Sequence, residues 1–285
     1  MKKYLLAAIA ILLFASTGFS GGGWPQKKGK TFLKLSQWWV VADRHYTASG
    51  GIDPNGTRGI FNTSIYAEHG ITDRLTGIVY FPFFSRSTLN EQVGATSGQV
   101  IGEGDALNSI GDTDLTLKYG LTPNSPWAVS ASITLGIPLG NDRGGRDGSL
   151  QTGDGEFNQI VQIDVSRGFK LGNVYPYFSV SSGLNNRTKG FSDEWRYGIE
   201  SGLTIGKFTG IVRLFGVQSL KNGEGRAIDA GTSIFANNSE FMSFSPELAF
   251  NIKDNLGISA SYATAFSGSI IFANPSYSVG VFLKL

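Results

Sequence analysis

The sequence predicts an all-β chain, an antiparallel up-and-down transmembrane β-barrel of about twelve strands. Segments of about 9 to 12 residues alternate between apolar and polar side chains, and ~9–11 residues suffice for a tilted strand to cross a bilayer. Their connections alternate strictly between short and long, which is typical of membrane barrels and not of soluble sandwiches. The last segment keeps this alternation to the final residue. Together these patterns favour a barrel over a large soluble β domain.

Composition agrees with a sheet protein. The chain has 285 residues, with 39 Gly, 20 Phe, 10 Tyr and 5 Trp, and its mean hydropathy is -0.03. After residue 20 no run is apolar over the ~20 residues that a membrane-spanning helix needs. Cysteine is absent from the sequence, which excludes disulfides and thiolate metal sites.

The amino terminus indicates export. Lys2 and Lys3 precede an apolar run, 5–14, and small residues follow as far as Ser20. This order is typical of a secretory signal peptide, residues 1–20, with cleavage near Ser20. Without Lys2 and Lys3, the 24 basic residues fall to 22, which equals the 22 acidic ones. A nucleic-acid partner therefore has no electrostatic support.

The rest of the chain divides into a short periplasmic segment, 21–30, which is flexible and locally basic, and the barrel, 31–285. The first strand begins at Thr31, but the adjacent Trp38 and Trp39 blur its register. We expect loops at 42–57 and 84–111, because turn residues and polar residues dominate there. The expected strands are 31–41, 58–69, 74–83, 112–119, 129–137, 156–166, 175–184, 194–205, 208–219, 241–252, 256–266 and 277–285.

An even strand count places both termini in the periplasm, and the barrel must close because unpaired amides in hydrocarbon are costly. Odd strands then run outward, so aromatic residues gather at the two membrane interfaces. The expected periplasmic ring is Tyr119, Trp127, Phe169, Tyr175 and Phe208. The expected external ring is Trp39, Phe81, Phe83, Phe157, Trp195, Tyr197, Phe266 and Tyr277.

The closing strand has apolar residues at every second position. It resembles the carboxy-terminal assembly signal of bacterial outer-membrane barrels, which usually ends in Phe, whereas this chain ends in Leu. The resemblance implies the bacterial outer membrane as location, with outer-membrane lipid and the barrel-assembly machinery as partners. The residues of this predicted signal are Tyr277, Val279, Val281, Leu283 and Leu285.

Three internal segments carry a more specific resemblance: 66–75 (YAEHGITDRL), 111–120 (GDTDLTLKYG) and 153–157 (GDGEF). They are similar to segments of the outer-membrane transporter family named for a meta-pathway of phenol degradation, which is distantly FadL-like. The resemblance implies transport of small, hydrophobic or aromatic molecules. FadL proteins have a plugging amino-terminal domain, but only 21–30 is available here, without its motif.

Charged residues recur opposite the apolar positions and are expected to line the lumen, because a charge facing lipid at mid-membrane costs ~2–4 kcal/mol. Two roles stay open: a structural ion-pair network filling the barrel, or a selectivity constriction. Asp114 and Arg196 should lie at one depth, Lys118 and Glu200 at a lower one. The predicted lumen-lining residues are Glu68, Asp112, Asp114, Lys118, Asp164, Arg196, Glu200, Arg213 and Glu247.

No metal, cofactor or catalytic activity is predicted. The acidic loop 141–156 lacks the ligand spacing of an EF-hand. The two histidines, His45 and His69, fall on opposite sides of the membrane in this topology. We therefore expect a passive channel with a small-molecule solute as its partner. The alternative is a structural or adhesive barrel with a closed lumen that presents loops 84–111 and 220–240.

Overall fold

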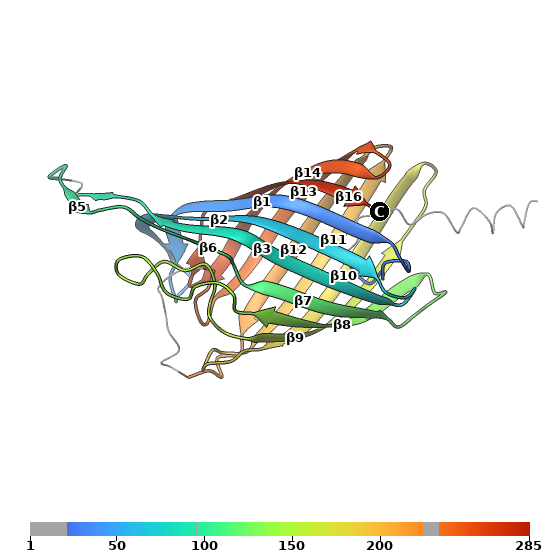
Figure 1. Cartoon of the computed structure of the whole chain (residues 1–285), viewed down its shortest axis with the longest axis horizontal. Coiled ribbons are helices and arrows are strands. Elements are labelled where there is room, and N and C mark those ends of the chain that lie inside the picture. The colour runs from blue at the N-terminus through green and yellow to red at the C-terminus, as the bar shows by residue number, and fades with distance from the viewer. Residues whose placement is uncertain (1–21, 95, 225–233) are drawn as a thin grey trace, which may run out of the picture.

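The computed structural model describes residues 22–94, 96–224 and 234–285, and their strands form a closed barrel (Figure 1). The predicted signal peptide, 1–20, lies outside these residues. Within the described part of the chain, no helix has the length and apolarity needed to span a membrane.

The barrel wall is an antiparallel sheet whose neighbours follow chain order. β1 pairs with β2 on one side and with β16 on the other, which closes the ring. The main wall strands are β1 (Thr31–Tyr46), β2 (Ile52–Gly70), β3 (Leu75–Leu89), β7 (Thr113–Gly120), β8 (Trp127–Ile137), β9 (Asn158–Gly168), β10 (Val174–Asn186), β11 (Glu194–Ile205), β12 (Phe208–Ser219), β13 (Glu240–Lys253), β14 (Leu256–Ser269) and β16 (Ser276–Lys284). The predicted twelve-strand antiparallel barrel is confirmed.

Two strands of this ring are extended by short pieces. β6 (Asp105–Ser109) continues the fourth strand alongside β3, and β15 (Ile271–Phe272) continues the last strand alongside β1. Both extensions lie at the end that carries the long loops, where the hairpin of β4 (Gln92–Val93) and β5 (Val100–Gly102) projects from the barrel (Figure 1).

Side chains alternate between the two faces of the wall. On β1, Leu35 and Val41 are exposed, whereas Phe32 and Val40 are buried. Trp38 lies on the inner face, where it lines a cavity, and Trp39 stacks on the outward Tyr277 with ring centroids 5.8 Å apart. The period of two therefore separates a lipid-facing apolar surface from a polar interior, and it resolves the register that the adjacent tryptophans blur.

The predicted loops 42–57 and 84–111 are wrong in extent. β1 continues to Tyr46 and β2 begins at Ile52, so only a short turn joins them. β3 continues to Leu89, and β4, β5 and β6 occupy much of the second segment. The backbone ladder continues beyond the membrane, but residues there no longer face lipid, so the apolar alternation that marks a strand in the sequence disappears.

The opposite end has short turns, the start of β1 and the end of β16. Gly206 and Lys207 alone join β11 to β12, and Gly206 has a φ of 58°, which a glycine adopts without steric cost. Thr31 and Leu285 exchange backbone hydrogen bonds of 3.0 and 2.8 Å. The first and last strand ends therefore lie side by side, as an even strand number requires.

Candidate functional site: the barrel lumen

The predicted lumen-lining residues lie on the inner wall or at its external rim. Eight are on strands, at positions that alternate with outward apolar residues, and Asp112 directly precedes β7. Glu68, Lys118 and Asp164 are buried. These charges do not form a single network. They divide among the periplasmic end of the lumen, a central cavity and the external mouth.

The periplasmic end of the lumen holds the segment 22–26. Lys118 Nζ donates to the Gly22 carbonyl at 3.0 Å. The Gly23 amide donates to Ser166 Oγ at 2.7 Å, and the Gln26 amide to Thr76 Oγ1 at 2.8 Å. The sequence predicts that this segment is flexible, but in the structure it packs against side chains from β3, β7 and β9.

Small residues on both sides make this packing possible. A Cβ atom at Gly23 would collide with the Ala128 carbonyl oxygen, and one at Gly22 would collide with the Ser166 and Ser179 hydroxyls. The Trp24 and Tyr177 rings form an edge-to-face pair, with ring centroids 5.7 Å apart. A run of inward serines on neighbouring strands, opposite a Gly-Gly pair, is the sequence signal that could have indicated this contact.

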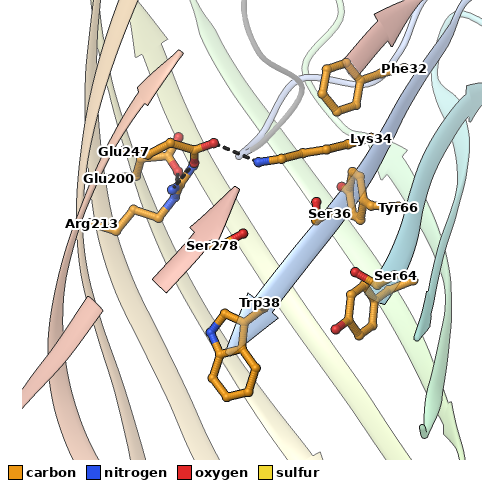
Figure 2. A pocket seen from close by; sticks show the side chains of 11 residues that line it. Phe32, Lys34, Ser36, Trp38, Ser64, Tyr66, Glu200, Arg213, Glu247 and Ser278 are labelled. Carbon is orange, nitrogen blue, oxygen red and sulfur yellow. Dashed lines mark hydrogen bonds and ion pairs between the residues drawn. The ribbon is translucent and has the colours of Figure 1, made fainter. Parts of the chain in front are cut away.

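Outward of this segment, the lumen contains a cavity of about 380 Å³ (Figure 2). Its aromatic wall consists of Phe32 and Trp38 from β1, Tyr66 from β2 and Tyr80 from β3. Three serines are the small residues of the lining: Ser36, Ser64 and Ser278. The remaining lining residues are charged: Lys34, Glu200, Arg213 and Glu247.

These four charged residues and Tyr177 form a continuous chain of hydrogen bonds, here called the charge ribbon. Arg213 donates to Glu200 at 2.5 Å and to Glu247 at 2.7 Å. Lys34 donates to the other oxygen of Glu247 at 2.8 Å, and Tyr177 Oη donates to Glu200 at 2.7 Å. Two cations therefore compensate two carboxylates, and the ribbon crosses the lumen from β10 to β1.

A second set of charges, the mouth cluster, lies at the external end and consists of Arg187, Asp154, Glu156 and Glu194. Arg187 pairs with Glu194 at 2.7 Å, with Asp154 at 3.3 Å and with Glu156. The Arg187 and Glu156 side chains are 4% and 0% exposed, so this network excludes water. The sequence pattern does not identify Arg187 and Glu194, because they lie at strand ends where the alternation stops.

Asp112 fastens the external loop 138–157 to this end of the barrel. Its carboxylate accepts the Gly140 amide at 2.9 Å and the Asp154 amide at 2.8 Å. Burial, with a further contribution from the Asp154 carboxylate, raises the pKa of Asp112 to about 7. Burial also raises the pKa of Glu156 to about 7, although Arg187 acts in the opposite direction.

Lys118 and Glu200, which are expected to lie at similar depth in the lumen, do not form an ion pair with each other. Lys118 binds the amino-terminal segment, whereas Glu200 binds Tyr177 and Arg213. His45 pairs with Phe272 at the external end, and His69 with Thr31 at the periplasmic end. Among the residues that the structure describes, no group of three or more His, Asp or Glu is arranged to hold a metal ion.

The predicted assembly signal lies on β16 and at the chain end. Tyr277, Val279, Val281 and Leu285 are exposed. The intervening Phe282 points inward, is fully buried and stacks on Phe32 with centroids 5.8 Å apart. An outward apolar stripe is what a strand facing lipid requires. Recognition of this strand by the assembly machinery stays a prediction.

Solved outer-membrane barrels share this fold. The COG4313 outer membrane channel from Pseudomonas putida F1 matches with a TM-score of 0.60 and 16% identity, over 94% of this chain and 100% of that one. The translocator domain of the autotransporter NalP from Neisseria meningitidis matches with a TM-score of 0.50 and 13% identity, over 99% of this chain and 94% of that one. The KdgM porin matches with a TM-score of 0.46 and 9% identity, over 89% of this chain and 98% of that one.

At these identities the likeness shows the fold alone. This chain has the fold of a twelve-strand outer-membrane β-barrel, and that fold is consistent with the bacterial outer membrane as its location. The two barrels above that match with a TM-score of 0.50 or more are a channel and an autotransporter translocator domain. No family model and no curated protein matches the chain, so the phenol-degradation family stays a prediction.

Proposed function

We propose that this barrel is a channel for passive uptake of small, uncharged, aromatic or apolar molecules across the outer membrane. The observation that carries the proposal is the central cavity, whose aromatic wall faces a compensated set of charges. A volume of about 380 Å³ lies in the range of pockets that hold small ligands. Aromatic faces favour aromatic and apolar solutes.

The charge ribbon supports a preference for uncharged solutes. Each carboxylate in it already contacts a cation at 2.8 Å or less. An incoming ion would lose hydration without gaining an uncompensated partner. Tyr80 Oη and the serine hydroxyls of the lining offer hydrogen bonds to a polar group on the solute.

The amino-terminal segment supports a gated passage. Residues 22–26 contact side chains of β3, β7, β9 and β10 at the periplasmic end of the lumen. A solute that leaves the cavity for the periplasm must therefore pass this segment. Its attachment depends on few hydrogen bonds, chiefly those of Gly22, Gly23 and Gln26. A neutral hydrogen bond contributes ~0.5–1.5 kcal/mol net and the one from the charged Lys118 ~1.5–3 kcal/mol, so displacement of the segment is energetically feasible.

Adjacent tryptophans on opposite faces of β1 provide the test. We expect cells without other porins to take up radiolabelled benzyl alcohol faster when they express this protein. Trp38→Ala should lower that increment roughly two- to tenfold, because an aromatic contact contributes ~0.5–1.5 kcal/mol. The control Trp39→Ala removes the same ring from the lipid face and should leave uptake unchanged. Equal loss in both variants would contradict a lumen site.

The structural or adhesive alternative gives a different result in the same assay. If the barrel is closed and only presents loops 84–111 and 220–240, neither the wild type nor either tryptophan variant should raise uptake. Absence of any increment for folded wild-type protein would therefore reject the channel and favour that alternative.

A further inference from the structure

The periplasmic end of the barrel carries an excess of positive charge. Its turns and amino-terminal segment, 22–30, 70–74, 121–126, 167–173, 206–207 and 253–255, contain eight basic residues and two acidic ones, Asp73 and Asp254. The basic residues are Lys27, Lys28, Lys30, Arg74, Arg167, Lys170, Lys207 and Lys253. The rest of the chain after residue 20 has the opposite balance, 14 basic against 20 acidic residues.

The basic residues of this rim also differ from those elsewhere in their contacts. In the parts of the chain that the structure describes, ion pairs join Lys34, Arg44, Arg146, Arg187, Arg196, Arg213 and Lys221 to carboxylates. Within the described ranges of the chain, no ion pair includes any of the eight rim cations. These seven cations of the lumen and the external end are thus paired with carboxylates, whereas the side-chain hydrogen bonds of Arg74 and Lys207 within the protein are to the backbone carbonyls of Gly120 and Ile252. The rim therefore keeps positive charge that no carboxylate of the described residues compensates.

Three rim cations lie on aromatic rings at the periplasmic interface. Arg74 Cζ lies 4.7 Å from the centre of the Tyr119 ring. Arg167 Cζ lies 5.0 Å from the Trp127 ring and 5.3 Å from Phe169. Lys170 Nζ lies 5.8 Å from the Tyr175 ring. All four rings belong to the predicted periplasmic girdle, so these cations lie at the depth of lipid headgroups.

We propose that this rim binds the phosphate groups of anionic phospholipids in the periplasmic leaflet of the outer membrane, chiefly through Arg74, Arg167 and Lys170. A guanidinium stacked on a ring keeps its N–H edges directed sideways, and these match phosphate oxygens in bidentate geometry. The cation–π contact restrains the side chain before the lipid binds, which lowers the ordering cost of binding.

The position of the three cations favours lipid over a soluble acidic partner. They lie among exposed apolar side chains on the outside of the wall, including Leu121 and Leu171. Acyl chains cover such residues, and the phosphate then meets the cations just beyond them. A soluble polyanion would instead approach the amino-terminal segment below the lumen, where Lys27, Lys28 and Lys30 are exposed.

A comparison of two triple variants with the same change in charge tests this proposal. Arg74→Gln, Arg167→Gln and Lys170→Gln together remove the rim site. Arg86→Gln, Arg143→Gln and Arg146→Gln together remove three external charges as a matched control. Each full-length mature protein is purified from mixed phosphatidylglycerol and phosphatidylcholine, and its retained lipids are counted by native mass spectrometry.

Wild type and the external control should retain phosphatidylglycerol in preference to phosphatidylcholine. The rim variant should lose this preference roughly tenfold or more, since each basic residue near an anionic surface contributes measurably. Equal preference in all three proteins would overturn the proposal, as would rim-dependent binding of a soluble polyanion without any lipid preference.

If the rim triple does not fold, the wild type still provides a test. Raising the salt concentration from about 0.1 M to about 1 M shortens the screening length to ~3 Å and should abolish the preference for phosphatidylglycerol. A preference that is independent of salt would contradict phosphate binding by the rim. Neither experiment depends on whether the barrel transports a solute.

Discussion

The charge ribbon and the mouth cluster line the same lumen but are built differently. Every ribbon residue is on a strand interior, where ladder hydrogen bonds fix its register, and the Arg213 side chain keeps 34% exposure to the cavity. The mouth cluster combines strand ends with the loop 138–157, and its central Arg187 side chain is only 4% exposed. The first network is hydrated and the second is dry.

The two networks also differ in charge balance. In the ribbon two cations meet two carboxylates. In the mouth cluster Arg187 meets three carboxylates, and Arg196 adds a second contact to Glu194 at 2.8 Å. A dry site with excess carboxylates retains protons more readily than a balanced, hydrated one. Stability should therefore depend on pH at the mouth, and ion selectivity should depend on the ribbon.

Removal of Arg187 should give the largest effect. Arg187→Ala leaves Glu156 buried without its cation and leaves Glu194 with Arg196 alone, and breaking a buried pair in this way costs ~3–5 kcal/mol. We expect a lower thermal midpoint and protease cleavage within the loop 138–157 of intact cells. Arg187→Lys keeps the positive charge but lacks the planar set of guanidinium donors, so its thermal midpoint should lie between those of the wild type and Arg187→Ala. Unchanged midpoint and protection in Arg187→Ala would show that the cluster does not hold the loop.

Removal of Arg213 should destabilise less and change selectivity more. The cost should lie between the ~0–1 kcal/mol of a surface pair and the ~3–5 kcal/mol of a buried one, because Glu247 keeps Lys34 as a partner and the Glu200 side chain is 20% exposed. In Arg213→Gln two carboxylates would face Lys34 alone, so any residual ion current should become cation-selective. Reversal potentials in a salt gradient measure this, and Glu247→Gln should shift the potential in the opposite direction. Shifts of the same sign would refute the compensation argument.

The pH dependence separates the networks further. Because the pKa values of Asp112 and Glu156 are raised to about 7, the folded mouth binds protons that the unfolded chain releases. Stability should therefore be highest in acid, fall as the pH rises from the ordinary carboxyl range of ~4 to about 7, and then level off. Asp112→Asn should weaken this dependence, since an amide does not titrate but still accepts the Gly140 N–H. Thermal midpoints at about pH 5 and pH 8 provide the measurement, and a rise with pH would contradict it.

Alternation explains which parts of the lumen the sequence predicts. Arg213 and Glu247 could be assigned to the interior because each stands between apolar residues, and Glu200 because it alternates with Ile199 and Leu203. The barrel and its strand order follow from the same period. Outside the hydrocarbon this constraint disappears, so the continuation of β1 to Tyr46 and of β3 to Leu89 leaves no pattern in the sequence.

Contacts between segments far apart in the chain also cannot be predicted from the sequence. Arg187 meets Glu156 across 31 positions of the chain, and Gly23 meets Ser166 across 143. Such contacts depend on how loops and the amino-terminal segment fold back into the barrel, and no local periodicity encodes that. Gly22 and Gly23 mark a close approach of two backbones opposite inward serines. That meaning can be read from the sequence only once the positions of the strands are known.

The smallest expected effect concerns the end of the ribbon and tests how far its compensation extends. Tyr177→Phe removes the hydrogen bond to Glu200, measured at 2.7 Å, but keeps the ring that meets Trp24. Glu200 keeps Arg213 as its partner at 2.5 Å, so the loss should be only ~0.5–1.5 kcal/mol. The thermal midpoint should fall slightly, and the selectivity that Arg213 sets should not change, because no charge has been removed. Tyr119→Phe on the outer wall is the control for a lost hydroxyl. A shift in reversal potential in Tyr177→Phe alone would mean that the phenol, and not the ion pairs, positions Glu200 in the cavity.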